Sequence, residues 1–344
     1  MKRYAGITAI SRFLPETKLT NIELSEIFPE WSAEKIYEKT GILERRIAAE
    51  NTMASDLATQ AAVKLFHGTG ISPDSVDFLL FCTQTPDYLL PSSSCLIHQR
   101  LALRSDCGAL DVNMGCSGFV YSLSVAVSMI ESGMVQRVLV LCADTYSKLI
   151  QPGDRSVMPL FGDAGAAVMV ELVESEKPCI HGFAFGTDGN GAKNLIVHHS
   201  ACKKEYSEKS VFRDNSGEFR SAEYLYMDGP EILQFTLQKV PVLFQTILEK
   251  SQLDLDAIDL VVLHQANRFL LDALRKKLKV KQEKFAIELE LTGNTVSCTI
   301  PLALIECIRK GSLKPGMTSM LAGFGVGYSW AGCVIHSGEI HAFI

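Results

Sequence analysis

The sequence predicts an α/β fold of stacked sheets and helices that consists of two duplicated halves. Apolar, strand-like runs alternate with helical patterns along almost all of the 344 residues. Hydrophobic residues make up 47% of the chain, which is enough for a large buried core and excludes general disorder. Segments with matching spacing recur in the two halves, which we place at residues 1–175 and 176–344.

Local patterns predict the elements in order along the chain. Residues 55–66 carry apolar side chains at helical spacing, and Gly68 closes this helix. Pro91 opens the next helix, because proline suits a first helical turn. The other predicted elements are strands at 76–82 and 137–143, a glycine turn and strand at 161–170, and helices at 231–250 and 267–279.

The duplication is seen first in two strands of equal length. In the first half, an apolar run leads from Asp77 to Cys82. In the second half, a run of the same length leads from Asp259 to His264. The two runs therefore predict equivalent buried strands.

Two helices repeat in the same way. The distance from Cys116 to Gly133 equals the distance from Asn294 to Gly311, and each segment reads as a loop followed by a helix that glycine ends. A duplicated unit brings its corresponding loops together around a pseudo-twofold axis. We therefore expect Cys116, His264 and Asn294 to meet in one pocket, where a thiol, a base and an amide suit acyl chemistry.

Residues 188–223 differ from the rest of the chain. They are rich in Gly, Lys, Glu, Ser and His and show little periodicity. Long connections of this kind are often functional. We expect an excursion that joins the two halves, contains a hairpin, and caps the pocket or follows its rim.

Charge and composition limit the function. The net charge of −6 argues against a broad nucleic-acid-binding surface, and no apolar run is long enough to cross a bilayer. The apolar stretch after Lys2 and Arg3 is too short for the core of a secretory signal. The ten cysteines contain no C-x-x-C pair and no ligand-like cluster, so we expect no metal site and a reduced, cytoplasmic protein.

Cys116 is the candidate nucleophile. It lies between a predicted strand and a helix, where small neighbours admit a substrate and the helix N-terminus lowers the pKa of a thiol. An arbitrary cysteine is usually an inert core residue. The matched Asn294 and the strand-end His264 favour the functional interpretation here.

His264 and Asn294 have alternatives of their own. His264 follows a buried strand, where α/β folds place site residues, but a hydrogen-bonded core histidine is about as common. Asn294 stands in a tight turn before a helix, where asparagine is usually a cap. Its amide can equally donate to a developing enolate oxygen.

A glycine-rich turn covers residues 323–330 and includes Phe324 and Val326. It can supply a backbone N–H to an oxyanion, together with the N–H of Cys116. It lacks the lysine and hydroxyl of a phosphate-binding loop.

Basic residues mark one face of the predicted helix at 267–279. The default interpretation is a solvated face. On an acidic protein, a basic stripe close to His264 also suits an acidic partner. The residues are Arg268, Arg275, Lys276 and Lys279.

The chain resembles the β-ketoacyl-acyl-carrier-protein synthase III family, of the thiolase-like superfamily, over essentially its full length. The segments that carry the resemblance are TGILERRIA at 40–48, DVNMGCSGF at 111–119, FGDAGAA at 161–167, HQAN at 264–267, GNT at 293–295 and GVGYSW at 325–330. The resemblance implies a five-layered αβαβα fold, a homodimer and a Cys-His-Asn triad at Cys116, His264 and Asn294. It implies no metal or redox cofactor.

The resemblance also implies a reaction. The Cys116 thiolate takes an acyl group from an acyl-CoA while the backbone N–H groups of Cys116 and Val326 hold the oxyanion. A malonyl-acyl carrier protein then enters and loses carbon dioxide, while His264 and Asn294 stabilise the enolate. The carbanion attacks the acyl-cysteine and gives a β-ketoacyl product, which starts a fatty-acid chain.

The remaining site residues come from the same resemblance. Substrate contacts are expected at Arg155 and Trp31 for CoA, at Phe324, and at Leu90, where the family often has an aromatic residue from the second subunit. Carrier-protein docking is expected at Arg268, Arg275, Lys276 and Lys277. Val326 stands where the family has glycine, and Gln234 replaces a basic docking residue.

Three other functions remain open at this point. A condensing enzyme of a specialised pathway would keep the triad and use a longer or unusual acyl primer. A non-catalytic acyl-binding partner of another synthase would be expected to lose its cysteine. A cysteine hydrolase also uses Cys, His and Asn, but the papain-like signatures are absent.

Overall fold

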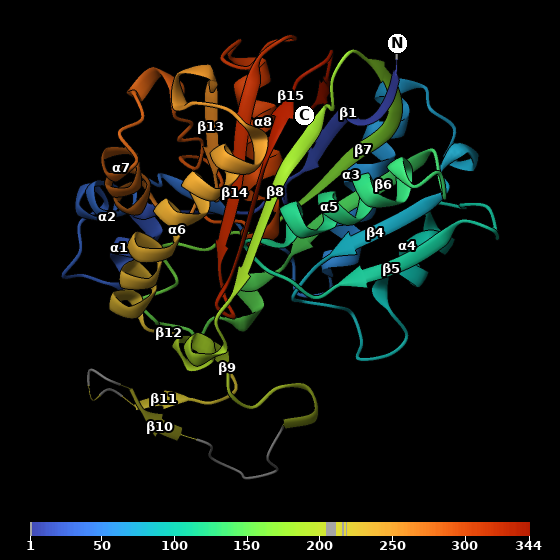
Figure 1. Cartoon of the computed structure of the whole chain (residues 1–344). Coiled ribbons are helices and arrows are strands. Elements are labelled where there is room, and N and C mark those ends of the chain that lie inside the picture. Colours follow the sequence, from blue (N-terminus) through green and yellow to red (C-terminus); the bar gives the residue numbers. More distant parts are fainter. Residues whose placement is uncertain (1, 204–210, 215–216, 218) are drawn as a thin grey trace.

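Two β-sheets and three layers of helices form the computed structural model, which describes residues 2–203, 211–214, 217 and 219–344 (Figure 1). The sheets stand beside one another with helices between them and on both outer faces. This is the five-layered αβαβα arrangement, and the predicted fold class is confirmed.

The first sheet has the strand order β16-β1-β7-β6-β4-β5. Its inner strands are almost entirely apolar because helices cover both faces. Strands β4 and β6 are parallel, whereas β7 is antiparallel to both of its neighbours β6 and β1. The bounds are β1 Lys2–Phe13, β4 Phe78–Cys82, β5 Gly108–Val112, β6 Arg137–Asp144, β7 Ala164–Ser175 and β16 His341–Phe343.

The second sheet repeats this plan. Its order is β13-β14-β15-β8, with β13 parallel to β14 and the two later pairs antiparallel. The order and directions match β4-β6-β7-β1 of the first sheet. The bounds are β8 Ile180–Thr187, β13 Leu260–Leu263, β14 Thr318–Gly325 and β15 Ser329–His336.

Helices α5 (Gly118–Glu131) and α8 (Thr299–Arg309) form the central layer, and α5 contacts strands of both sheets. Their apolar residues are buried on almost all sides, as expected for helices between two sheets. Helices α3 (Ala54–Thr69) and α4 (Ser93–Arg100) cover the first sheet, and α6 (Gly229–Ser251) covers the second. Helix α7 (Arg268–Lys277) packs beside α6.

The helix ends correct three sequence predictions. Helix α3 continues past the expected stop at Gly68 and ends at Thr69, and Gly70 caps it in a left-handed conformation at φ 72°. Helix α4 begins two residues after Pro91. Helix α8 begins only at Thr299, because a 3₁₀ turn at Val296–Cys298 intervenes after Asn294.

The excursion after β8 holds two small strand pairs. Strand β9 (Leu195–Val197) pairs with β12 (Leu225–Met227) close to the body, and β10 (Val211–Arg213) pairs with β11 (Phe219–Ser221) as the expected hairpin. The hairpin projects away from the two sheets (Figure 1). Within the predicted span 188–223, residues 204–210, 215–216 and 218 lie outside the described residues.

The remaining elements lie at the edges. Strand β16 pairs with β1, so the last strand of the second half joins the sheet of the first. The boundary between the two halves, placed after residue 175 from the sequence, stays a prediction. None of the helices in the described ranges is long and apolar enough to span a membrane. The short elements are β2 Lys18–Thr20, α1 Asn21–Ile27, α2 Ala33–Thr40 and β3 Glu44–Arg46.

Candidate active site

A cavity of about 420 Å³ brings the three candidate residues together, since Cys116, His264 and Asn294 all line it. This volume lies within the range of small-molecule sites. Cys116 lies in the turn before α5, His264 directly follows β13, and Asn294 precedes α8. The rest of the wall is mainly apolar and includes Leu160, Phe161, Leu195, Met227, Ile232, Leu233, Phe269, Leu270 and Phe324.

Cys116 is packed tightly from the side of the second sheet. A Cβ atom added to Gly325 would lie 2.9 Å from the Cys116 Sγ, and one added to Gly323 would lie 2.4 Å from the Cys116 carbonyl oxygen. Only glycine therefore lets the end of β14 approach the turn that carries the thiol. Strand β14 fixes where the sulfur lies.

The resting thiol of Cys116 is neutral. Burial raises its pKa to about 12, and the nearby carboxylate of Asp144 adds to this effect. The backbone N–H groups of Val326 and of Cys116 itself are directed at the sulfur and oppose the rise. The same two donors are therefore available for negative charge that develops beside the sulfur.

His264 is a buried, neutral imidazole. Burial lowers its pKa to about 3, and the ring meets the edge of Phe324 at 5.7 Å between ring centres. Its Nδ1 lies 2.7 Å from the hydroxyl oxygen of Thr299. The other ring nitrogen, Nε2, is left for the cavity.

The Thr299 hydroxyl also determines which nitrogen of His264 carries the proton. This hydroxyl donates to the carbonyl oxygen of Val296 at 3.0 Å. A hydroxyl has one hydrogen, so it then accepts from Nδ1–H, and Nε2 keeps a free lone pair. In that tautomer Nε2 can take a proton from a thiol.

Asn294 is held by its backbone and by its side-chain oxygen. Its N–H donates to Leu160 at 2.9 Å, its carbonyl accepts from Gly162 at 3.0 Å, and its Oδ1 accepts from the N–H of Val296 at 3.0 Å. The amide nitrogen, a pure donor, is thereby left for the cavity. Val296 makes this contact from φ 54°, an uncommon backbone conformation for a β-branched residue.

Asp144 connects the two halves beneath the site. This fully buried carboxylate ends β6 and accepts from the N–H of Gln84 at 2.8 Å and from the N–H of Ser297 at 3.2 Å. The hydroxyls of Thr83 and Ser297 also donate to it. Burial nevertheless raises the pKa of Asp144 to about 7.

The glycine-rich turn lies where the sequence places it. Phe324 is buried and lines the cavity, and Val326 is half-buried directly after β14. Val326 is not among the residues with positive φ, so valine occupies this position without left-handed strain.

The residues expected to contact CoA lie outside the cavity wall. Arg155 is exposed and forms an ion pair with Glu30 at 3.7 Å, and Glu30 precedes Trp31. The Lys39 ammonium lies 4.8 Å from the centre of the Trp31 ring. Arg155 and Trp31 are therefore brought to one part of the surface.

Leu90 does not reach the cavity of its own chain. It is 83% exposed, next to the exposed Tyr88 and Leu89, in the loop between β4 and α4.

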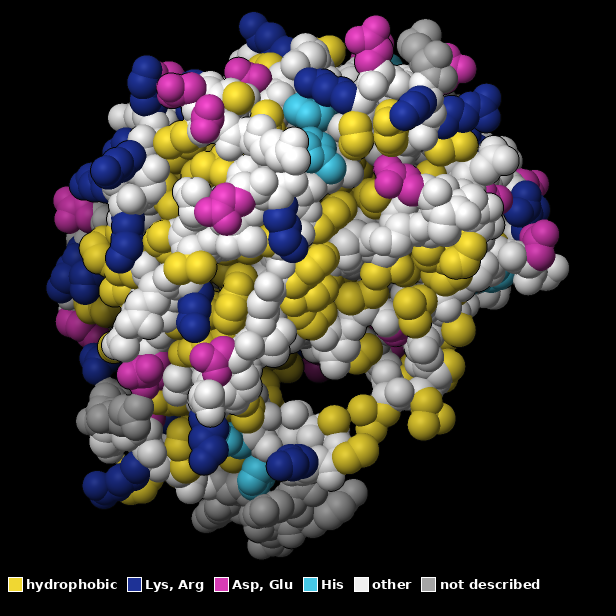
Figure 2. Space-filling model, in the orientation of Figure 1, with side chains coloured by type: hydrophobic (Ala, Val, Ile, Leu, Met, Phe, Trp, Pro, Cys, Tyr) yellow, Lys and Arg dark blue, Asp and Glu magenta, His cyan; other side chains and the backbone are white. Residues whose placement is uncertain are grey.

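The basic residues of α7 divide into two kinds. Lys276 and Lys277 are exposed, whereas Arg268 and Arg275 are half-buried. The side chain of Arg268 packs against Gly41, where an added Cβ would lie 2.4 Å from it. In Figure 2, Lys and Arg side chains gather along the left margin, where Figure 1 places α7 and α2.

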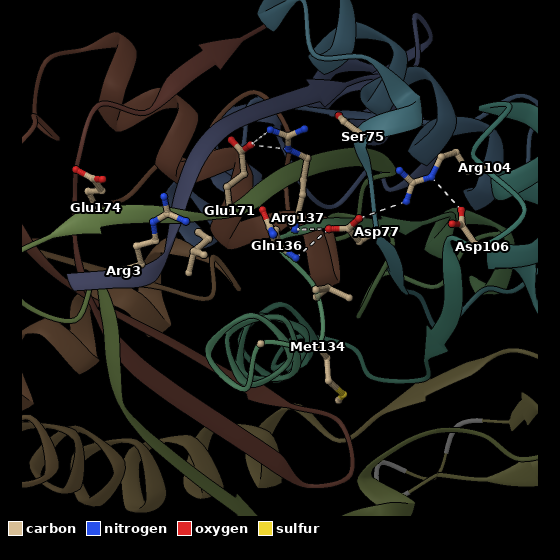
Figure 3. Close-up of a pocket in the computed structure, with 13 residues that line it drawn as sticks. Arg3, Ser75, Asp77, Arg104, Asp106, Met134, Gln136, Arg137, Glu171 and Glu174 are labelled. Carbon is tan, nitrogen blue, oxygen red and sulfur yellow. Dashed lines mark hydrogen bonds and ion pairs between the residues drawn. The ribbon is translucent and has the colours of Figure 1, made fainter. Parts of the chain in front are cut away.

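A larger hollow, about 810 Å³, lies at the far ends of the first-sheet strands and contains none of the candidate catalytic residues. Its charges largely neutralise one another (Figure 3): Arg104 pairs with Asp77 and Asp106, and Arg137 pairs with Glu171. The smaller cavity is therefore the better candidate for the active site despite its size.

Within the described residues, no three His, Cys, Asp or Glu side chains are grouped so as to hold a metal ion.

Sequence reasoning missed four residues that lie behind the cavity wall and support the site: Gln84, Asp144, Thr299, and Tyr146, whose hydroxyl donates to Gln84 Oε1 at 2.6 Å. Gln84 and Asp144 each follow or end a predicted strand, a position that signals a site in α/β folds. Tyr146 and Thr299 carry no comparable signal, because their partners come from distant parts of the chain.

Models of one family match both halves. The "3-Oxoacyl-[acyl-carrier-protein (ACP)] synthase III" model matches residues 110–189, and its C-terminal counterpart matches residues 248–337. Among curated proteins, a β-ketoacyl-[acyl-carrier-protein] synthase III from Caldanaerobacter subterraneus is 35% identical and covers 96% of this chain and 97% of its own. A second one, from Lactococcus lactis, is 36% identical and covers 97% of this chain and 99% of its own.

Solved structures agree with the sequence comparisons. A 3-oxoacyl-(acyl-carrier-protein) synthase III superposes with a TM-score of 0.95 at 49% identity and covers 97% of this chain and 100% of its own. A 3-oxoacyl-(acyl-carrier-protein) synthase from Burkholderia xenovorans superposes with a TM-score of 0.91 at 35% identity and covers 99% of this chain and 97% of its own. The priming β-ketosynthase of the R1128 polyketide pathway superposes with a TM-score of 0.87 at 29% identity and covers 98% of this chain and 97% of its own.

Proposed function

Because the chain belongs to the β-ketoacyl-[acyl-carrier-protein] synthase III family, we propose that it condenses an acyl-CoA primer with malonyl-acyl carrier protein and so initiates fatty-acid synthesis. The observation that carries this proposal is one apolar cavity lined by Cys116, His264 and Asn294. Two backbone N–H groups, of Cys116 and Val326, face the sulfur in that cavity. The enzyme is an acyltransferase of the condensing type.

In the first half-reaction the Cys116 sulfur attacks the acyl-CoA thioester. Because the buried thiol is neutral, it must lose its proton as the bond forms, and Nε2 of His264 is the base available in the cavity. The N–H groups of Cys116 and Val326 hold the oxyanion. Collapse of the tetrahedral intermediate expels the CoA thiolate, which takes the proton back from Nε2 and leaves as CoA-SH.

In the second half-reaction the malonyl thioester loses carbon dioxide, and its enolate attacks the acyl-cysteine. The free amide nitrogen of Asn294 donates to the enolate oxygen. His264 donates as well when the Thr299 hydroxyl donates to Nδ1 instead of to Val296, because the neutral ring then carries its proton on Nε2. The new carbon–carbon bond expels the Cys116 sulfur as a thiolate, which takes a proton from solvent. Carbon dioxide release drives the step, so the proposed reaction needs no metal or redox cofactor.

A specialised pathway is the second candidate. The structural likeness to the priming β-ketosynthase of a polyketide pathway favours it, because that enzyme starts chains on the same fold. The chemistry at Cys116 is the same in both cases, and only the acyl primer differs.

The proposed partners follow from the surface. The exposed lysines of α7, Lys276 and Lys277, with Arg268 and Arg275 beside them, suit an acidic carrier protein. Arg155, which pairs with Glu30, and the neighbouring Trp31 are the proposed contacts for CoA. All ten cysteines are free thiols, which supports a reducing, cytoplasmic location.

A homodimer is the proposed assembly. Strand β5 is an edge strand of the first sheet, and its Leu110 is exposed. Figure 2 shows hydrophobic side chains gathered over α5, β8 and β5. The exposed Leu90 would then reach the cavity of the second copy rather than its own.

Mass spectrometry of intact protein tests the proposal. Incubation with acetyl-CoA should add one acyl group to the wild type and none to Cys116→Ala, and malonyl-carrier protein should then remove it as β-ketoacyl product. Asn294→Ala should keep self-acylation and lose decarboxylation. An adduct that is released only as free acid would indicate a hydrolase, and no adduct from any acyl-CoA would indicate a non-catalytic binding partner.

A further inference from the structure

Two buried serines connect the turn that carries Cys116 with the turn between β14 and β15. Ser117 directly precedes α5, and Ser329 is the first residue of β15. Their hydroxyl oxygens lie 2.7 Å apart although the residues are 212 positions apart in the chain. Their exposed fractions are 0% and 3%. The pair is therefore a buried link beside the nucleophile, shielded from water.

The direction of the hydrogen bonds follows from the groups that can donate. The Ser329 hydroxyl lies 2.8 Å from the carbonyl oxygen of Val326, which can only accept. Because a hydroxyl has one hydrogen, Ser329 uses it for Val326 and accepts the second bond from the Ser117 hydroxyl. The link therefore runs in one direction, from Ser117 through Ser329 to the backbone of Val326.

The link holds Val326 together with two further contacts. Gly325, the residue before it, pairs with Ser329 in the β14–β15 ladder. The Val326 side chain lies against the backbone next to Cys116, since a Cβ added to Gly115 would be 2.8 Å from its Cγ1. The residue is thus held through its chain neighbour, its side chain and its carbonyl oxygen.

The position of Val326 matters because its N–H is directed at the Cys116 sulfur, as is the N–H of Cys116 itself. The two donors belong to different turns, so their relative placement depends on how these turns are joined. Apolar packing is non-directional, whereas the serine link is directional. Val326 packs against an apolar cluster that includes Cys116, Val157 and Val296.

We propose that Ser117 and Ser329 are positioning residues that keep the Val326 N–H aimed at the oxyanion formed when Cys116 is acylated. The inference rests on the proposed function and goes beyond it, because it assigns a role to two hydroxyls outside the cavity wall. Without the link the N–H is still present but less precisely aimed. Stabilisation of the tetrahedral intermediate then weakens, since it depends on donors that are fixed in advance.

The test measures single-turnover acylation of Cys116 over a range of acetyl-CoA concentrations, together with thermal melting. Ser329→Ala should lower the acylation rate constant at saturation by about 10-fold. The acetyl-CoA concentration that gives half the maximal rate should stay unchanged, because the oxyanion exists only after attack. A purely structural role would not separate these two quantities.

A double-mutant cycle tests whether the two serines act in series. Ser117→Ala should have the smaller effect, because Ser329 can still donate to Val326. The double variant should be no slower than Ser329→Ala alone, since Ser117 acts through Ser329.

Ser11→Ala is the matched control. It removes another fully buried serine, which lies in β1 and donates to the carbonyl oxygen of Ala61 at 2.6 Å. Acylation by this variant should match the wild type, whatever its melting temperature. Wild-type rate constants in both folded serine variants, multiplicative losses in the double variant, or an equal loss in Ser11→Ala would overturn the inference and leave the proposed function standing. The absence of any adduct in the wild type would overturn both.

Discussion

The hydroxyl of Thr299 lies 2.7 Å from Nδ1 of His264 and connects the start of α8 with the end of β13. The same hydroxyl donates to the Val296 carbonyl at 3.0 Å. Thr299 thus controls both the orientation of the imidazole and the position of its proton. In the proposed reaction Thr299 is a positioning residue, because it contacts His264 and does not line the cavity.

Thr299→Val should lower condensation by about 10-fold or more, because the methyl group keeps the shape but no longer orients Nδ1. Thr299→Ser keeps the hydroxyl and should restore most of the rate. The measurement is kcat for β-ketoacyl formation over pH 5–9, together with thermal melting. A purely structural role for Thr299 would show as lowered melting temperature with an unchanged pH profile.

Gly325→Ala should abolish or strongly slow acylation of Cys116. The new Cβ would lie 2.9 Å from the Sγ and 3.0 Å from the Cβ of Cys116, so either the strand or the nucleophile must move. Rates of adduct formation by mass spectrometry provide the measurement. Gly338→Ala is the control, since a Cβ there meets nothing within 4 Å. Normal acylation by the Gly325 variant would show that the sulfur is not held by β14.

At Val296, glycine should be tolerated better than alanine, which reverses the usual order. The residue is fully buried, so both substitutions lose packing, but only glycine relieves the strain at φ 54°. We expect Val296→Gly to be less destabilising than Val296→Ala by about 1 kcal/mol in urea unfolding. At Val157, buried in the same cluster without positive φ, alanine should be the milder change.

Acid should destabilise the protein through His264. Its pKa is about 3 in the folded state and near its ordinary 6.5 when unfolded. Between these values the unfolded state binds the additional proton, so stability falls as the pH decreases from 6.5 toward 3. At pH 4.5 the loss should be roughly 2–3 kcal/mol.

The His264→Gln variant isolates this contribution, because glutamine does not titrate. Urea midpoints of the two proteins, measured from pH 7.5 to 4.5, should converge as the pH falls. Parallel curves would show that the imidazole is accessible to protons in the folded state.

Equal spacings in the sequence predicted the triad because duplication preserves the positions of loops. Two pairs of segments with equal spacing were enough to predict that Cys116, His264 and Asn294 line one cavity. The layered fold could be predicted for the same reason, since buried strands and central helices leave continuous apolar runs.

The supporting contacts could not be predicted in this way. Tyr146 finds Gln84 62 positions away, and His264 finds Thr299 35 positions away, through geometry that no local pattern encodes. The delayed start of α8 depends on the left-handed Val296, a residue type that ordinarily avoids that conformation. The return of β16 to the first sheet is likewise a tertiary pairing.

The central layer has a consequence for the independence of the two halves. Helix α5 contacts both sheets, and the buried carboxylate of Asp144 in one half accepts from Ser297 in the other. A protein equal to the first half alone would expose the side of α5 that packs against the second sheet, and Asp144 would lose the donors of Ser297. Joining the halves in one chain makes their association independent of protein concentration, so that one half can supply the thiol and the other the imidazole and amide.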